Sequence, residues 1–210
     1  MSAVQIFRGH LRACPLIAIV RGLAPEEAEA VGAALIEAGI RIIEVPLNSP
    51  RPFDSIGLLA KRFGGDATIG AGTVLDPADV ARVQSAGGVL TVSPNTALPV
   101  IEATVAANMV AAPGFFTPSE AFAALGAGAH ALKLFPAEAT TPAVARALLA
   151  VLPKGTDLII VGGVGPDTMQ PWLAAGATGF GLGSGLFTPG RSAAEVGAKA
   201  RAYVAGLARG

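Results

Sequence analysis

Cysteine, histidine and charged residues are scarce in this chain of 210 residues. Cys14 is the only cysteine, so no disulfide can form within the chain and a reducing, cytoplasmic setting is expected. The two histidines, His10 and His130, have no metal-ligand spacing, so no metal site is expected. Lysine plus arginine equals aspartate plus glutamate at 15 each, which gives no reason to expect nucleic acid or an anionic membrane as a partner.

Signals for membrane insertion, export and nucleotide binding are also missing. The longest uncharged stretch, Thr168–Gly190, contains six glycines and two prolines, which excludes a membrane helix. Met1–His10 lacks the apolar core of a signal peptide. The glycine-rich run at Gly179 has no acidic residue about 20 positions further on, as a dinucleotide site requires. We therefore expect no membrane association and no cofactor.

One pattern is abundant: a short apolar run, turn residues, an alanine-rich stretch at helical spacing, and a glycine. The runs begin between 20 and 27 residues apart, the length of a strand, a helix and two short loops. Eight such runs are present: Leu16–Arg21, Arg41–Leu47, Ala67–Val74, Val89–Pro94, Met109–Gly114, Ala131–Pro136, Leu158–Val164 and Gly179–Gly185.

The character of these runs predicts the architecture. They are almost continuously apolar, which indicates strands buried on both faces and hence a parallel sheet covered by helices. Eight strand–helix units favour closure into a TIM (β/α)8 barrel, with an open doubly wound sheet as the alternative. No linker or change of composition divides the chain, so residues 1–210 are expected to form one domain. The expected helix ends carry Gly39, Gly87, Gly128 and Gly176. Prolines lie near the expected helix starts: Pro25, Pro50, Pro77, Pro118, Pro142 and Pro166.

Two of the predicted strands carry a charged residue in their interior, which burial disfavours. Glu44 lies in the second strand and Lys133 in the sixth. In an apolar lumen the pKa of a lysine falls, and a neutral amine is a nucleophile toward carbonyl carbon. A nearby carboxyl group can transfer the protons that such chemistry requires. The alternative is a structural Lys–Glu ion pair in the core, and the pattern alone leaves both open.

Several strand ends carry residues suited to anions. Arg21 closes the first strand, where it could bind a carboxylate or phosphate, although a surface arginine is equally compatible. The last two strands end in Gly162-Gly163 and Gly181–Gly185. Glycine lets backbone N–H groups approach phosphate oxygens, and the loops after strands seven and eight form the phosphate site common in these barrels. Close helix packing is the alternative reason for these glycines.

Five segments carry a specific combination of motifs, in this order: Ile42-Ile43-Glu44-Val45, Ile69-Gly70-Ala71-Gly72-Thr73-Val74-Leu75, Val92-Ser93-Pro94, Leu132-Lys133-Leu134-Phe135-Pro136-Ala137-Glu138 and Gly162-Gly163-Val164. Through these segments the chain resembles the KDPG/KHG aldolase family, the class I aldolases of the Entner–Doudoroff and related pathways. The likeness extends from about residue 15 to residue 190.

The resemblance implies a role for each matched residue. Lys133 corresponds to the Schiff-base lysine and Glu44 to the general acid/base. Cleavage of a phosphorylated 2-keto-3-deoxy sugar acid to pyruvate and a triose phosphate, without a cofactor, is the implied reaction. A homotrimer of (β/α)8 barrels is the implied assembly. The implied substrate contacts are Thr73, Pro94 and Phe135 for the pyruvate moiety, with Gly162, Gly163, Gly183 and Ser184 for the phosphate.

One departure from the family pattern bears on the substrate. Glucose-series members read Thr-Leu-Arg-Thr after the catalytic glutamate, whereas this chain has Pro46–Pro50 with Asn48 in place of the arginine. Arg21 is the candidate replacement for the lost carboxylate contact. The Pro-Leu-Asn-Ser-Pro sequence of residues 46–50 resembles the galactonate branch of the family, whose substrate is 2-dehydro-3-deoxy-6-phosphogalactonate (KDPGal). Val161 agrees, because an apolar side chain cannot hydrogen-bond the C4 hydroxyl that distinguishes the two epimers.

Three functions therefore remain open from the sequence. The first is cleavage of the galactonate epimer, KDPGal. The second uses the same chemistry on the gluconate epimer, KDPG, or on unphosphorylated 4-hydroxy-2-oxoglutarate. The third is a phosphate-binding barrel isomerase or epimerase, or a non-catalytic sugar-phosphate binder, which would keep the glycine loops but need no imine at Lys133.

Overall fold

The computed structural model describes residues 1–208, so residues 209–210 of the expected domain lie outside the described residues. All strand pairs are parallel. They form one sheet in the order β5-β4-β3-β2-β1-β9-β8-β7-β6. The strands are β1 Leu16–Ile19, β2 Ile42–Pro46, β3 Thr68–Gly72, β4 Leu90–Val92, β5 Val110–Ala112, β6 Gly114–Phe115, β7 Leu132–Leu134, β8 Leu158–Val161 and β9 Gly179–Leu182.

The two edges of this sheet belong to one stretch of chain. β5 and β6 are separated only by Pro113, and they pair with β4 and β7 respectively. Proline has no N–H to give to a ladder, so the fifth strand is interrupted at that residue. Its two halves close the sheet into a barrel of eight strand positions. The predicted (β/α)8 barrel is confirmed, and the open doubly wound sheet is wrong.

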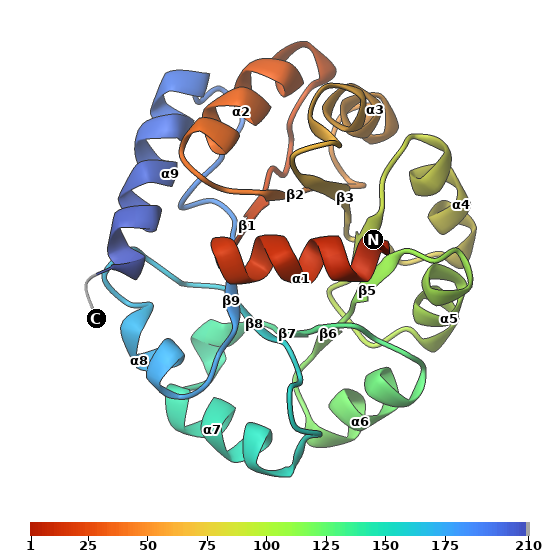
Figure 1. Ribbon diagram of the computed structural model, residues 1–210, viewed down its shortest axis with the longest axis vertical. Coiled ribbons are helices and arrows are strands. Elements are labelled where there is room, and N and C mark those ends of the chain that lie inside the picture. Colours follow the sequence, from red (N-terminus) through yellow and green to blue (C-terminus); the bar gives the residue numbers. More distant parts are fainter. Residues whose placement is uncertain (209–210) are drawn as a thin grey trace.

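Helices surround the barrel as a ring, as Figure 1 shows. Gly39, Gly87, Gly128 and Gly176 follow helices with φ of 103°, 88°, 93° and 102°, the left-handed conformation expected after a helix C-terminus. Pro50 and Pro166 lie in turns instead of at a first helical residue. The helices are α1 Ala3–Ala13, α2 Pro25–Glu37, α3 Pro52–Phe63, α4 Pro77–Ser85, α5 Leu98–Ala106, α6 Pro118–Gly126, α7 Pro142–Val151, α8 Gln170–Ala174 and α9 Ala193–Leu207, with a 3-10 turn η1 at Ala137–Ala139.

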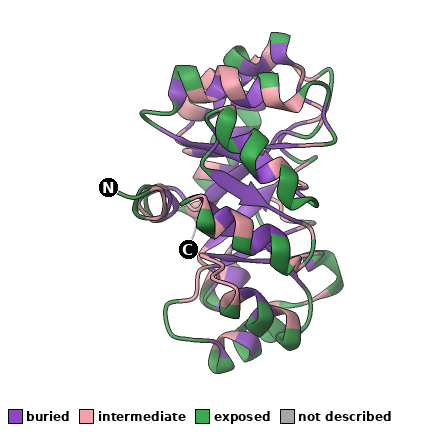
Figure 2. Cartoon of the chain, turned by 90° about the vertical axis from the view of Figure 1, so that its right-hand side faces the viewer, coloured by how far each residue is buried: buried purple, intermediate pink, exposed green. Residues whose placement is uncertain are grey.

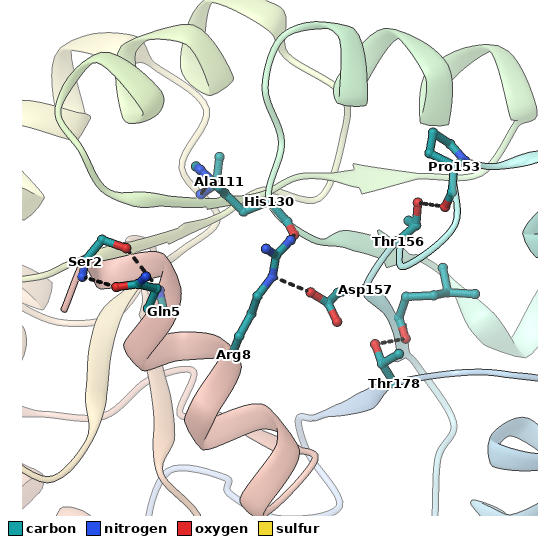
Figure 3. A network of polar contacts seen from close by, with 10 residues as sticks. Ser2, Gln5, Arg8, Ala111, His130, Pro153, Thr156, Asp157 and Thr178 are labelled. Atoms are coloured by element: carbon teal, nitrogen blue, oxygen red, sulfur yellow. Dashed lines mark hydrogen bonds and ion pairs between the residues drawn. The ribbon is translucent and has the colours of Figure 1, made fainter.

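Helix α1 closes one end of the barrel and lies across its centre in Figure 1. Phe7 and Leu11 of α1 are buried in the lumen core together with apolar strand residues. On its polar side, Arg8 Nε donates to Asp157 Oδ2 at 2.9 Å, in the network drawn in Figure 3. A ligand can therefore enter the lumen only from the opposite end, where the strands have their carboxyl termini.

Strand residues alternate between two cores. Ile43 and Val45 of β2 pack toward the helices, whereas Ile42 belongs to the lumen core. Because successive side chains of a strand point to opposite faces, Glu44 shares the lumen side with Ile42. Figure 2 shows the buried strands inside and exposed residues along the outer faces of the helices.

Within residues 1–208, every helix is too short or too polar to span a membrane.

Candidate active site

Glu44 and Lys133 face the same lumen from β2 and β7. Leu132 and Leu134, which flank Lys133, pack toward the helices, so Lys133 points inward. Only 2% of Glu44 and 7% of Lys133 is exposed. Gly72 of the neighbouring strand makes room for the carboxyl group, because a Cβ there would lie 1.7 Å from Glu44 Oε2. The barrel therefore brings together the two charged strand residues that the sequence singled out.

Burial shifts the pKa values of both groups toward their neutral forms. Desolvation raises the pKa of Glu44 to about 7, although the positive charges of Lys133 and Arg21 oppose this change. Desolvation lowers the pKa of Lys133 from 10.5, and Arg21 lowers it further, while the charge of Glu44 opposes both. Burial therefore favours the uncharged forms of the pair, an amine and a carboxylic acid, over the charged forms.

No direct bond joins the two side chains. Within residues 1–208 the ion pairs are Arg8–Asp157, Arg51–Glu26 and Arg82–Asp79, and Glu44 Oε2 has no hydrogen-bond partner. Both side chains border a void of about 10 Å³, close to the smallest volume that admits one water molecule. The structural ion pair, which was the alternative for Lys133 and Glu44, is absent from this lumen.

A cavity of about 570 Å³ opens above this pair at the carboxyl ends of the strands. Lys133 stands at its floor, and the walls come from the ends of β1, β3, β4, β7, β8 and β9. Such barrels place their active sites at this end. Among its lining residues are all the predicted substrate contacts: Arg21, Thr73, Pro94, Phe135, Val161, Gly162, Gly163, Gly183 and Ser184.

Arg21 is held in the cavity by two side chains. Its Nη1 donates to Asn48 Oδ1 and, at 3.3 Å, to Thr73 Oγ1. Thr73 has φ of 55°, a left-handed conformation that is uncommon for a β-branched residue and occurs at functional sites. The Gly22 N–H donates to Ser49 Oγ at 2.9 Å, which joins the β1 loop to the β2 loop. Asn48, which stands at the sequence position where glucose-series members have an arginine, therefore contacts Arg21.

The loops after β8 and β9 present unpaired backbone donors. Within residues 1–208, the N–H groups of Gly163, Val164, Ser184 and Gly185 donate to no protein acceptor. All four residues line the cavity. Gly183 O accepts from the N–H groups of Leu186 and Phe187, which makes the second loop a tight turn. Unpaired N–H groups on facing loops form an anion-binding concavity.

Glu138 is a cavity residue for which the sequence predicted no role. It is exposed, and its Oε2 lies 2.0 Å from the position that a Cβ on Gly162 would occupy. A side chain at Gly162 would therefore collide with it. Its position at a strand end, three residues after Phe135, was the signal that could have identified it.

No metal site accompanies this cavity. Within the part of the chain that the structure describes, no group of three or more histidine, cysteine, aspartate or glutamate residues is placed to hold a metal ion.

Fold and site together define the class of protein: a (β/α)8-barrel aldolase with a buried lysine at the floor of an open cavity and a buried glutamate that borders the same small void as this lysine. The family described as KDPG and KHG aldolase matches residues 8–196. The chain belongs to this family, which confirms the resemblance.

Individual relatives agree with this membership. A probable 2-dehydro-3-deoxy-6-phosphogalactonate aldolase of Rhizobium meliloti (strain 1021) is 50% identical over 191 residues, 91% of this chain and 90% of its own. The 2-dehydro-3-deoxy-6-phosphogalactonate aldolase of Escherichia coli (strain K12) is 45% identical over 190 residues, 90% and 93% of the two chains. A solved structure described as native KDPGal has a TM-score of 0.91 at 44% identity and covers 92% of this chain and 94% of that one.

Proposed function

We propose that this protein is a class I aldolase that cleaves KDPGal to pyruvate and D-glyceraldehyde 3-phosphate, with Lys133 as the imine-forming nucleophile. The observation that carries the proposal is the burial of Lys133 beside Glu44 at the floor of the cavity, with the pKa of the amine lowered. Similarity to relatives that bear this name supports the choice of substrate.

The first half of the reaction forms the imine. The lone pair of the neutral Lys133 amine attacks the C2 carbonyl carbon of the keto acid to give a carbinolamine. Burial raises the pKa of Glu44 to about 7, so a protonated fraction is present at neutral pH. This protonated form donates the proton with which the C2 hydroxyl leaves as water. The void between the two groups leaves space for a water molecule to relay this proton. The product is a cationic iminium ion.

The second half breaks the carbon–carbon bond. The C3–C4 electron pair moves into the iminium ion to form an enamine, and the carboxylate of Glu44 takes the proton of the C4 hydroxyl. Glyceraldehyde 3-phosphate leaves. Glu44 returns the proton to C3, and water hydrolyses the pyruvate imine and frees Lys133. No other group is required, because the imine itself is the electron sink.

The substrate carboxylate is assigned to Arg21, whose guanidinium lies beside Thr73 in the cavity. Arg21→Ala should raise KM by about 10–100-fold, because a charge-assisted hydrogen bond to the ground-state substrate is lost. Arg21→Lys keeps the charge but not the planar pair of donors, so its KM should lie between those of the wild type and Arg21→Ala. Steady-state kinetics on both variants decide the assignment, and unchanged constants in Arg21→Ala would reject it.

The phosphate group is assigned to the loops after β8 and β9. The free N–H groups of Gly163, Val164, Ser184 and Gly185 supply donors without a side-chain cation. The Ser184 hydroxyl and Gly183 belong to the same wall of the cavity. Thr73, Pro94 and Phe135 then enclose the pyruvate end, and the ring of Phe135 lies 4.7 Å from Lys133 Nζ.

The galactonate epimer is favoured over the gluconate epimer because Val161 presents no hydroxyl to the cavity. The test is the ratio of kcat/KM for the two C4 epimers, which should favour KDPGal. A strong preference for the gluconate epimer would overturn this choice of substrate and leave the imine mechanism intact.

Val161→Thr should move that ratio toward the gluconate epimer by about 10-fold, because threonine adds a hydroxyl to a side chain of the same shape. Val161→Ala is the matched control, since it enlarges the site without adding a hydrogen-bonding group. Equal effects of the two substitutions would mean that volume, and not the hydroxyl, sets the preference.

We also propose a homotrimer. Four large apolar side chains are exposed on consecutive units of one side of the barrel: Leu75 after β3, Leu98 at the start of α5, Phe116 after β6 and Phe122 in α6. Exposed apolar residues on adjacent elements are suited to a subunit interface. Light scattering should give three times the chain mass of 20.9 kDa. Phe122→Glu should lower that mass, and a monomeric wild type would reject the trimer.

A further inference from the structure

Tyr203 is a buried titratable residue that the proposed reaction does not use. It lies in α9 and only 4% of it is exposed. Its hydroxyl donates to the backbone oxygen of Val164 at 3.0 Å. The backbone of Gly185 lies against the same hydroxyl, because a Cβ there would be 2.4 Å from the tyrosine oxygen. One side chain therefore contacts both loops that carry the free N–H groups.

Arg191, just before α9, binds backbone carbonyl groups of the loop after β9. Its Nη1 donates to Leu186 O at 2.7 Å and to Ser184 O at 3.3 Å. In a trans peptide the C=O and N–H groups point in opposite directions. With Ser184 O turned toward Arg191, the N–H of Gly185 is directed away from Arg191. Arg191 itself is absent from the cavity wall, whereas Gly185 belongs to it.

The loop after β8 is also held by hydrogen bonds. Its Val164–Gly165 peptide is held at both ends, because Val164 O accepts from Tyr203 and the N–H of Gly165 donates to Thr168 Oγ1 at 2.8 Å. The chain just beyond it is attached to the end of α9, where Gln170 Nε2 donates to Gly206 O at 3.2 Å. Figure 1 shows α9 beside α2 on the outside of the barrel. A rigid outer helix therefore anchors both loops.

We propose that Tyr203 and Arg191 are positioning residues that hold the two loops with their free N–H groups directed at a bound phosphate. A cradle built mainly from backbone donors has no charged side chain that can adjust to the ligand, so its affinity depends on how well the loops are fixed in advance. Identification of the anion as the substrate phosphate rests on the proposed function. The geometry of the cradle does not.

The test uses Tyr203→Phe and Arg191→Met in the full-length protein. Arg201→Met is the matched control, because Arg201 is exposed on the same helix. Binding of inorganic phosphate is followed by ³¹P NMR titration, and KM is measured for the phosphorylated keto acid. Exchange of the C3 protons of pyruvate with deuterated water reports the imine and enamine steps without any phosphate.

Both variants should weaken phosphate binding and raise KM by about 10-fold, the factor expected from one lost hydrogen bond, and should leave pyruvate exchange intact. Arg191→Lys, which keeps a donor, should recover part of the loss. Wild-type phosphate affinity in Tyr203→Phe and Arg191→Met, or a parallel loss of exchange that indicates general damage, would overturn the inference. A wild type that binds phosphate but exchanges no pyruvate protons would instead refute the proposed function.

Discussion

Replacing Lys133 by methionine should reduce aldol cleavage by at least about 10⁵-fold, because an enzyme that loses its nucleophile retains only binding and general electrostatic effects. Methionine fills a similar volume but cannot form an imine. The other lysines, Lys61, Lys154 and Lys199, are outside the cavity wall and cannot replace it. Lys154→Met is the matched control, since Lys154 is exposed. A coupled assay of pyruvate release measures the loss.

The same substitution should stabilise the fold. Burial lowers the pKa of Lys133, so the folded protein disfavours the charged amine that the unfolded chain carries at neutral pH. Methionine removes this penalty, and Glu44, without the opposing charge of Lys133, remains protonated. We expect the free energy of unfolding to rise, because an apolar side chain replaces a group whose charged form the core disfavours. Chemical denaturation at pH 7 tests this, and a clear destabilisation would show that Lys133 contributes to the core instead of straining it.

Glu44→Gln should lower kcat by about 10²–10⁴-fold, the contribution typical of a general acid–base group. It should also change the pH dependence. The reaction requires a neutral amine and a protonated carboxyl group, which is one proton shared by the pair. Wild-type kcat/KM should therefore fall below pH about 7, where the pair takes up a second proton, and should fall again at alkaline pH, where the last proton is lost.

The glutamine variant has only the lysine left to titrate. Its residual kcat/KM should rise once with pH and then remain level, so the alkaline decline disappears. Glu102→Gln, a change at an exposed glutamate, should keep the bell-shaped profile. A bell-shaped profile in Glu44→Gln would assign the proton transfer to another group.

The pH dependence of the free energy of unfolding is an independent test of the raised pKa of Glu44. Its pKa is raised from 4.5 to about 7, so the folded protein binds this proton more tightly than the unfolded chain. The resulting stabilisation is complete below pH 4.5 and is lost as the pH rises through about 7. Relative to the glutamine variant, the wild type should therefore become progressively less stable over this range.

Much of the fold was predictable because its signals are local. The apolar runs located all eight strand positions, since parallel strands buried on both faces admit few polar residues. Glycines at positions 39, 87, 128 and 176 located helix ends because few other residues adopt the left-handed conformation found there. The break in the fifth strand at Pro113 was missed, although proline in a run that reads as a central strand argues for an interruption.

Helix α1 was missed for a different reason. It precedes the first strand and so lies outside the repeating unit on which the prediction rested. Its start carries a capping box, in which Ser2 and Gln5 satisfy each other's backbone groups. That signal was present in the sequence. The sequence did not indicate where this helix packs, because the closure of a barrel end by an apolar helix face is a tertiary contact.

The site shows the same division between strand positions and loop contacts. Glu44 and Lys133 stood out because charge inside an apolar strand is costly, and β-alternation directed both into the lumen. The contact between Arg21 and Asn48, and the position of Glu138 against Gly162, depend on loops whose conformations have no period in the sequence. Tyr203 is further still from the motif residues, and only the packing of α9 brings it to Val164.

The most direct measurement is reduction by borohydride in the presence of pyruvate, followed by mass analysis of the peptides. A neutral, buried amine at position 133 predicts a stable pyruvate adduct on the peptide that contains Lys133 and on no other lysine peptide. An unmodified Lys133 peptide, or a label carried by Lys61, Lys154 or Lys199, would contradict an imine at the floor of the barrel.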